Sequence, residues 1–295
     1  FPAYDLIDHH PNYQFDNQLF DGKMMTQILT ATGSNQKCNF CSAQLVYEPF
    51  KDRIVINHLE RLVELGFDAV FFNDPNFTSP WRGDGETTSH EIDVKDRYGR
   101  VKGLMHALID SGVNRELVWG CQTKATMVNP ELLDLMVKAG CGYITYALEN
   151  VDRDSLKQLQ KGVTPEAVAY AIRLSKERGI KTGLYVMLGT KPDAEENITI
   201  LQRTLDYVEE IRPGYLSTSV LAHYPMIDRE TGQKIHTELD YASKRYNRES
   251  VWLTFDEGWG AFHPYCDAEQ AGKYRDEIFS RMMTKKDIWN NIRFF

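Results

Sequence analysis

The chain has 295 residues, of which 42% are hydrophobic and 12% aromatic, so it can bury a large core and a disordered chain is excluded. Its 34 basic and 42 acidic residues give a net charge of −8, which argues against a general nucleic-acid or membrane-surface binder. No apolar run reaches the roughly 20 residues that span a bilayer. The absence of a signal peptide and an odd set of five cysteines favour a reducing cytoplasm.

The predicted elements repeat one pattern, in which an amphipathic helix ends at a glycine and a short apolar strand follows. An opening strand is predicted over residues 25–31. Asn57 and Glu60 have capping-box spacing, which predicts a helix that begins at Asn57 and ends near Gly66. A buried strand over Ala69–Phe72 comes next.

The pattern then returns along the chain. Residues 79–100 are interpreted as a long loop that either contacts a substrate or partner or is simply solvated. Later helices are predicted at 104–109, after the N-cap Asn129, after Thr164 and at 195–210. The strands that follow them are predicted at 117–122, 143–148, 183–188 and Tyr215–Val220.

About six units in which strands alternate with helices predict a parallel sheet, either doubly wound or closed as a barrel. In both architectures the functional residues lie at the C-terminal ends of the strands. The strand-end candidates are Asn73, Asp74, Gln122, Glu149 and Gly189.

The loop after the first strand contains Cys38 and Cys41. A Cys-x-x-Cys pair alone is ambiguous, because it fits half of a zinc site, a redox pair or two structural cysteines. Cys121 and Cys141 stand in apolar surroundings and are predicted to pack in the core. Cys266 is interpreted as a core or surface thiol rather than a metal ligand.

In context, the sequence resembles the radical S-adenosylmethionine superfamily over about residues 25–222. The family signature is Cys-x-x-x-Cys-x-x-Cys with an aromatic residue before the last cysteine. Cys38, Phe40 and Cys41 match it, and Ser34 stands where the first cysteine is expected. Further stretches match in order at 72–77, 119–124, 139–150, 156, 161–162 and 183–189. The match is most similar to the branch that carries a cobalamin-binding domain before the barrel.

The resemblance implies a partial (β/α)6 parallel barrel over 25–222, preceded by a linker at 1–24 and followed by a C-terminal extension at 223–295. It implies that Cys38, Cys41 and the residue at position 34 hold a 4Fe-4S cluster, whose open iron binds S-adenosylmethionine. Reductive cleavage would give a 5′-deoxyadenosyl radical that abstracts a substrate hydrogen. Methylation or rearrangement would follow where cobalamin takes part.

Family position also implies a set of S-adenosylmethionine contacts. Asn73 and Asp74 would receive the methionyl ammonium, and Glu149 would bind the ribose hydroxyls. Each has a simpler alternative, since Asn-Asp-Pro is also turn chemistry and a strand can end at an ordinary carboxylate. Phe40 and the backbone around Met187–Gly189 would flank the adenine, and Lys124 is a weaker candidate for the methionyl carboxylate. The residues implied to bind the cofactor are Phe40, Asn73, Asp74, Gln122, Lys124, Glu149, Met187 and Gly189.

Ser34 is a departure from the family, because iron–sulfur clusters are held by thiolates. Three explanations compete: a deliberate Cys→Ser substitution, a natural variant with Ser34 or another group as third ligand, or a protein that keeps the fold without radical chemistry. A radical enzyme without cobalamin and a non-catalytic binding protein therefore remain as alternatives.

The expected partners are a small-molecule or peptide substrate and an electron donor such as flavodoxin or ferredoxin. An RNA substrate is disfavoured, because no basic RNA-binding module is present. His223 follows the last strand and is a weaker candidate to face substrate. The C-terminal extension is predicted to end in packing helices at about 268–283 and 286–292.

Overall fold

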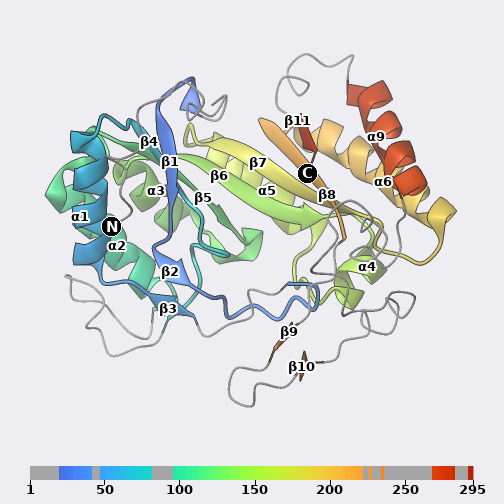
Figure 1. Cartoon of the computed structure of the whole chain (residues 1–295), viewed down its shortest axis with the longest axis horizontal. Coiled ribbons are helices and arrows are strands. Elements are labelled where there is room, and N and C mark those ends of the chain that lie inside the picture. The colour runs from blue at the N-terminus through green and yellow to red at the C-terminus, as the bar shows by residue number, and fades with distance from the viewer. Residues whose placement is uncertain are drawn as a thin grey trace. The chain divides into compact units, whose positions relative to one another are not determined.

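The computed structural model describes residues 20–41, 47–81, 96–221, 226–227, 234–235, 268–282 and 292–294. Its main feature is a seven-stranded sheet with the order β1-β4-β5-β6-β7-β8-β11 (Figure 1). The predictions for His223 and Cys266 lie outside the described residues.

Six strands of the sheet come from the repeated strand–helix pattern. They are β1 (Met25–Ile28), β4 (Ala69–Phe72), β5 (Val118–Thr123), β6 (Cys141–Glu149), β7 (Lys181–Leu188) and β8 (Tyr215–Val220). The seventh, β11 (Ile292–Phe294), comes from the C-terminal extension and pairs in parallel with β8. Short antiparallel pairs join β2 (Ala31–Thr32) to β3 (Glu48–Pro49) and β9 (Met226–Ile227) to β10 (Lys234–Ile235). The parallel half-barrel predicted from the sequence is confirmed.

Helices separate the successive strands. They are α1 (Asp52–Glu64), α2 (Gly99–Ser111), α3 (Pro130–Lys138), α4 (Arg153–Gln158), α5 (Pro165–Lys176), α6 (Ala194–Ile211) and α9 (Ala268–Met282), with 3-10 turns at Val113–Arg115 and Ala125–Met127. Within the described part of the chain, we find no helix with the length and apolar character needed to cross a bilayer.

The chain divides into two compact units. The first contains the described residues of Phe1–Asn35, Val46–Tyr146 and Tyr170–Gly183. The second contains those of Gln36–Leu45, Ala147–Ala169 and Leu184–Phe295. Strands β6 and β7 run through both units.

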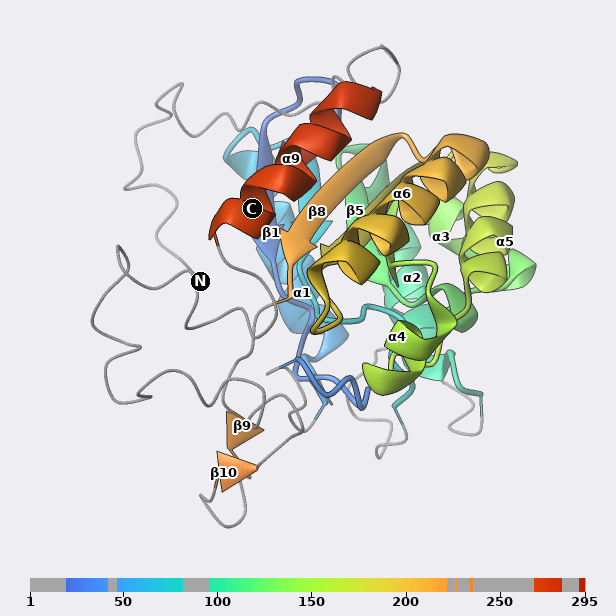
Figure 2. The same ribbon diagram turned by 90° about the vertical axis from the view of Figure 1, so that its right-hand side faces the viewer.

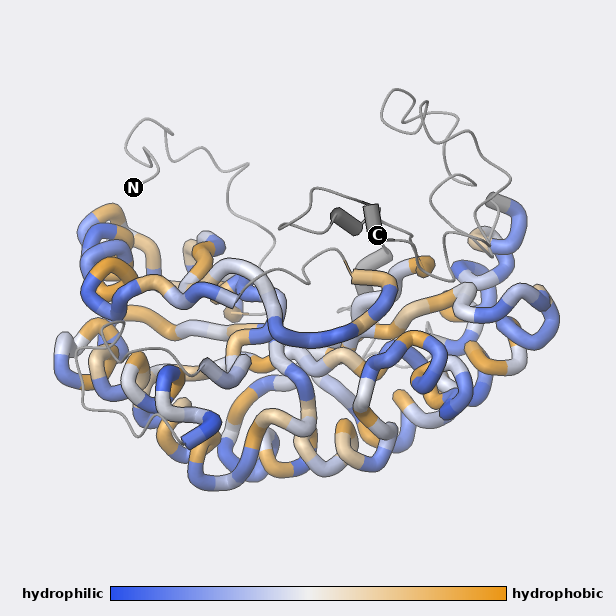
Figure 3. The backbone as a smooth tube through the Cα atoms, turned by 90° about the horizontal axis from the view of Figure 1, so that it is seen from below, coloured by the Kyte–Doolittle hydropathy of each residue, from blue (hydrophilic) through white to orange (hydrophobic). Residues whose placement is uncertain are grey.

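In the first unit, amphipathic helices cover the strands. Helix α1 buries an apolar stripe of Val55, Ile56, Leu59 and Leu62, and it packs against α2, which in turn packs against α3. Figure 3 shows that such helices carry polar residues as well as apolar ones. The aromatic rings of Phe72, Phe77 and Trp119 lie with centroids 5.0 to 5.4 Å apart. These contacts form the core behind β4 and β5.

Two predicted boundaries in this unit are wrong. Helix α1 begins at Asp52, so Asn57 lies inside the helix and does not cap it. The apolar stripe already includes Val55 and Ile56, directly before Asn57, and their burial outweighs the local capping signal. The opening strand ends at Ile28, because the backbone N–H groups of Thr30 and Ala31 donate to the Asp74 side chain.

One predicted cap is confirmed. The side chain of Asn129 accepts a hydrogen bond from the backbone N–H of Leu132 at 2.8 Å, and Pro130 opens α3. At the other end of α3, Gly140 has φ of +95°, which glycine tolerates without a side-chain clash.

In the second unit, α9 lies beside α6 (Figures 1 and 2). Arg281 donates to the carbonyl of Gln202 at 3.1 Å and forms ion pairs with Asp206 and Glu209. The predicted packing helix at 268–283 is thus confirmed as α9. The last predicted helix, at 286–292, lies outside the described residues apart from Ile292, which is in β11.

Candidate cofactor-binding site

Asp74 follows β4 in the first unit and is fully buried. Its carboxylate accepts hydrogen bonds from the backbone N–H of Thr30 at 2.6 Å, from the N–H of Ala31 at 3.2 Å and from the Thr30 hydroxyl. Burial raises the pKa of Asp74, while the Arg100 guanidinium and these hydrogen bonds oppose the increase. Both carboxylate oxygens are thus engaged within the protein, where they fix the backbone after β1.

Arg100 completes this arrangement from the first turn of α2. Its Nη2 donates to the Thr30 carbonyl at 2.8 Å and to the Thr30 hydroxyl oxygen at 2.9 Å. The guanidinium is 1% exposed and its carbon lies 5.9 Å from the centre of the Phe77 ring. The prediction that residues 79–100 form one loop therefore fails at its end, since Gly99 and Arg100 belong to α2.

The other candidates of the first unit lie around Asp74. Asn73 is exposed and borders a pocket of about 670 Å³, which Ile28, Phe50 and His58 also line. Gln122 donates from Nε2 to the Asp74 carbonyl at 3.0 Å. Lys124 is half-buried, and its backbone N–H donates to the Asn76 side chain at 3.1 Å.

In the second unit, the cysteine loop is attached to the C-terminal end of α4. The backbone N–H of Asn39 donates to the Leu159 carbonyl at 3.3 Å, and its Nδ2 donates to the Gln158 carbonyl at 2.7 Å. The N–H of Cys41 donates to the Cys38 carbonyl at 3.1 Å, which closes a turn. Cys38 is buried and Cys41 is half-buried.

Phe40 packs against a small apolar cluster formed by Leu159, Met187 and Leu221. Met187 lies near the end of β7, and Gly189 follows with φ of +68°, a conformation that suits glycine. Phe40 and the backbone at 187–189, both implied to flank the adenine, therefore belong to the same part of the second unit.

Glu149 ends β6 and is 5% exposed. It forms an ion pair with Lys161, whose Nζ also lies 5.7 Å from the centre of the Phe40 ring. Burial alone would lower the pKa of Lys161, but the negative charges of Glu149 and Cys38 more than offset that effect and raise it. A cation is thus held between the strand-end carboxylate and the cysteine loop.

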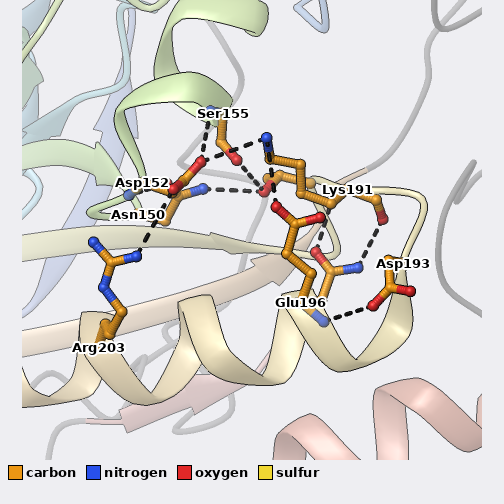
Figure 4. Close-up of polar contacts among 9 residues, drawn as sticks. Asn150, Asp152, Ser155, Lys191, Asp193, Glu196 and Arg203 are labelled. Atoms are coloured by element: carbon orange, nitrogen blue, oxygen red, sulfur yellow. Dashed lines mark hydrogen bonds and ion pairs between the residues drawn. The ribbon is translucent and has the colours of Figure 1, made fainter.

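A second polar network connects the loops after β6 and β7 (Figure 4). Asn150 donates to the Thr190 hydroxyl at 3.2 Å, and Thr190 donates to Ser155 at 3.2 Å. Asp152 caps α4 by accepting from the Ser155 N–H at 2.9 Å, and it lies 3.6 Å from Lys191 Nζ. These contacts brace the backbone that follows Glu149 and Gly189.

The donor set fits a 4Fe-4S cluster at two of three positions. Cys38 and Cys41 supply thiols at the family spacing, and neither forms a disulfide. Ser34 is 7% exposed and supplies a hydroxyl, a harder and less acidic ligand than a thiol. Across the described ranges, no three His, Cys, Asp or Glu side chains gather as a metal-binding group.

Cys121 and Cys141 are buried, as predicted, and burial raises the pKa of both thiols. This suits packing rather than metal binding.

Sequence reasoning missed four residues with central contacts: Thr30, Asn39, Arg100 and Lys161. Lys161 had a visible signal, since it lies in a stretch that resembles the family. The other three are ordinary loop or helix-end residues, and only the tertiary contacts reveal their positions.

The chain is similar to several known proteins. Cytidylyl-2-hydroxyethylphosphonate methyltransferase of Streptomyces wedmorensis is 25% identical over 246 residues, which cover 78% of this chain and 41% of that protein. This chain thus spans less than half of that relative.

Among solved structures, the chain is similar to the radical S-adenosylmethionine methyltransferase TsrM of Kitasatospora setae, solved with bound cobalamin and [4Fe-4S] cluster. The TM-score is 0.56 and the sequence identity 18%, and the match covers 69% of this chain and 38% of TsrM. The match to Streptococcus suis SuiB bound to precursor peptide has a TM-score of 0.55 and a sequence identity of 13%. It covers 92% of this chain and 49% of SuiB. A model of the radical SAM superfamily matches residues 28–201. The chain therefore belongs to the radical SAM superfamily.

Proposed function

We propose that this chain is the barrel of a radical S-adenosylmethionine methyltransferase that works with cobalamin on a small-molecule or peptide substrate. The superfamily uses a 4Fe-4S cluster and S-adenosylmethionine. The observation that carries the proposal is the second-unit cluster of Cys38, Phe40, Cys41, Glu149 and Lys161, which joins the cysteine loop to the strand-end carboxylate.

Each side chain has a proposed task. Cys38 and Cys41 hold the cluster, with position 34 as its third site, and the bound cluster supplies the electron that cleaves S-adenosylmethionine. Glu149 accepts the ribose hydroxyls, while Phe40 and the backbone of Met187 and Gly189 flank the adenine.

For the methionyl group of the ligand, the proposed contacts are those that family position implies. Asn73 remains the proposed contact of the methionyl ammonium, and Lys124 that of the methionyl carboxylate. Gln122 is a further proposed contact of the cofactor. Asp74 anchors the backbone after β1, because its oxygens are already engaged. The methionyl ammonium is therefore proposed to contact Asn73 rather than Asp74.

The methyltransfer part rests on the relatives. A methyltransferase shares 25% identity with this chain, and TsrM was solved with cobalamin and tryptophan in separate complexes. A radical enzyme without cobalamin is the alternative, as is a binding protein that keeps the fold. A flavodoxin or ferredoxin in the cytoplasm is the proposed electron source.

The deciding experiment compares the chain with its Ser34→Cys variant after anaerobic reconstitution. We expect iron and sulfide to reach about four each per protein in the variant, with less in the parent, and 5′-deoxyadenosine to form on reduction with S-adenosylmethionine. Corrinoid bound to the chain, measured by its absorbance, would support the cobalamin-dependent enzyme over the radical enzyme without cobalamin. No iron and no 5′-deoxyadenosine in either protein would overturn the enzymatic reading.

A further inference from the structure

The ion pair between Glu149 and Lys161 has unusual backbone at both ends. Glu149 has φ of +68°, in the left-handed region that non-glycine residues seldom adopt. Gln160, directly before Lys161, has φ of +53°. Such conformations persist only where the surrounding structure enforces them, and they concentrate at functional sites.

Helix α4 explains how Lys161 is placed. The N–H of Gln160 donates to the Lys157 carbonyl and the N–H of Lys161 donates to the Leu156 carbonyl, each at 3.0 Å. This is the Schellman pattern of a helix end, in which glycine usually takes the left-handed position that Gln160 occupies here. Lys161 therefore leaves the helix in a fixed direction.

The pair is well shielded, since the Lys161 and Glu149 side chains are 12% and 6% exposed. Lys161 contacts Oε1 of Glu149, and no other described residue donates to Oε2. A carboxylate offers about four acceptor positions, so an oriented Glu149 retains acceptors for two neighbouring hydroxyls. The same ammonium lies over the ring of Phe40.

We propose that Lys161 is a positioning residue for nucleoside binding, which orients Glu149 toward the ribose hydroxyls and holds Phe40 against the adenine. This inference rests on the proposed function, in which Glu149 and Phe40 contact S-adenosylmethionine. Lys161 itself touches neither the ribose nor the methionyl group.

The test measures Kd by equilibrium dialysis for two ligands, S-adenosylmethionine and its 2′,3′-dideoxyribose analogue. The proteins are the reconstituted full chain and its Lys161→Met and Lys161→Arg variants, all in the Ser34→Cys background. Lys157→Met is the matched control, because Lys157 is an exposed lysine on the same helix.

The parent and the Lys157 control should prefer S-adenosylmethionine over the analogue by about tenfold or more, the value of a charge-assisted hydrogen bond. Lys161→Met should reduce that preference to less than about threefold while binding the analogue almost normally, and Lys161→Arg should restore part of it. A merely structural role of Lys161 would lower the affinity for both ligands equally and leave the preference for S-adenosylmethionine unchanged.

The possible failures are distinguishable. If the parent binds neither ligand, the proposed function fails and the inference falls with it. If the parent binds both ligands with equal Kd, Glu149 does not bind the ribose hydroxyls and the inference is wrong. If Lys161→Met keeps the full preference, Lys161 does not position Glu149, although the proposed function stands.

Discussion

Asp74 and Thr30 are 44 residues apart in the sequence, yet the carboxylate of Asp74 accepts from both the backbone N–H and the hydroxyl of Thr30. Arg100 donates to the same hydroxyl oxygen and to the Thr30 carbonyl. Thr30 is therefore held on its N–H, carbonyl and side chain at once. It lies four residues before Ser34, so this contact fixes the beginning of the cysteine loop.

Replacing Thr30 with valine should destabilise the first unit. Valine keeps the shape but leaves the Asp74 oxygen and the Arg100 donor without the buried hydroxyl, which costs roughly 1–3 kcal/mol in free energy of unfolding. Urea denaturation measures it, with Thr26→Val on the partly exposed face of β1 as the control. Equal effects at the two positions would contradict the anchoring role of Thr30.

The charges of Arg100 and Asp74 should be coupled. Arg100→Met leaves the Asp74 carboxylate buried without the nearby cation, and we expect a loss of about 3 kcal/mol. Asp74→Asn removes the charge that Arg100 offsets, so the double variant should lose less than the sum of the single losses. We expect a coupling free energy of at least about 1 kcal/mol in a double-mutant cycle measured by urea denaturation. Losses of the two single variants that simply add would disprove the coupling between Arg100 and Asp74.

Local patterns predicted the fold well. Strand β4 at Ala69–Phe72 and strand β8 at Tyr215–Val220 were predicted with their observed bounds. A short apolar run with turn residues on both sides leaves little choice of where a buried strand begins and ends. The start of α1 was missed, since burial of Val55 decides it rather than the Asn57 capping signal. Competition between local signals and packing sets such boundaries.

The site was predictable in its residue types but not in its contacts. The cysteine spacing and the strand-end position mark Cys38, Cys41 and Glu149 as candidates. Nothing in the sequence states that Gln160 adopts a left-handed backbone, or that Asp74 turns its carboxylate toward Thr30. Both depend on segments that meet only in the folded chain.

Asn39 should matter more for cluster loading than for stability. The Asn39 side chain attaches the cysteine loop to the Gln158 carbonyl, and alanine removes this hydrogen bond but keeps the backbone bond to the Leu159 carbonyl. We expect Asn39→Ala to reduce iron bound per protein by about half or more, with an unfolding cost of only about 1 kcal/mol.

The measurement is iron and sulfide content after anaerobic reconstitution, alongside a thermal melt. Asn114→Ala is a matched control in the first unit, since the Asn114 side chain likewise donates to a carbonyl at a helix end, that of Lys138, and lies outside the cysteine loop. Unchanged iron content in Asn39→Ala would argue that cluster loading does not need the side-chain bond to Gln158.

Gly183 should not tolerate a side chain. A Cβ at this position would lie 2.0 Å from the hydroxyl oxygen of Tyr143 and 2.9 Å from Oγ1 of Thr145, and both neighbours are buried. Gly183→Ala should therefore destabilise the first unit by roughly 1–3 kcal/mol. Tyr143→Phe removes the nearest atom, so the double variant should recover part of the loss in a urea melt. If Gly183→Ala is as stable as the parent, the close approach of β6 and β7 is wrong.

Asp152 should give the second unit an acid-sensitive contribution to stability. Burial alone would raise the pKa of Asp152, but hydrogen bonds from Ser155 and the charge of Lys191 lower it overall. A carboxyl whose folded pKa lies below its unfolded value stabilises above the unfolded pKa, about 4, and loses that contribution as the pH falls through the folded pKa.

Asparagine also caps helices well, so Asp152→Asn isolates the charge from the cap, while Asp152→Ala removes both and should cost about 1 kcal/mol more. Urea denaturation from pH 7 down to pH 3.5 should show a constant gap in unfolding free energy between the parent and Asp152→Asn down to about pH 5. Below that pH the gap should narrow, because the two proteins become alike at this site as Asp152 takes up its proton. Asp154→Asn, at an exposed position of the same helix, is the control and should show no such trend. A gap that stays constant with pH would mean that Asp152 acts only as a cap, and that its contacts with Lys191 and Arg203 add nothing to stability.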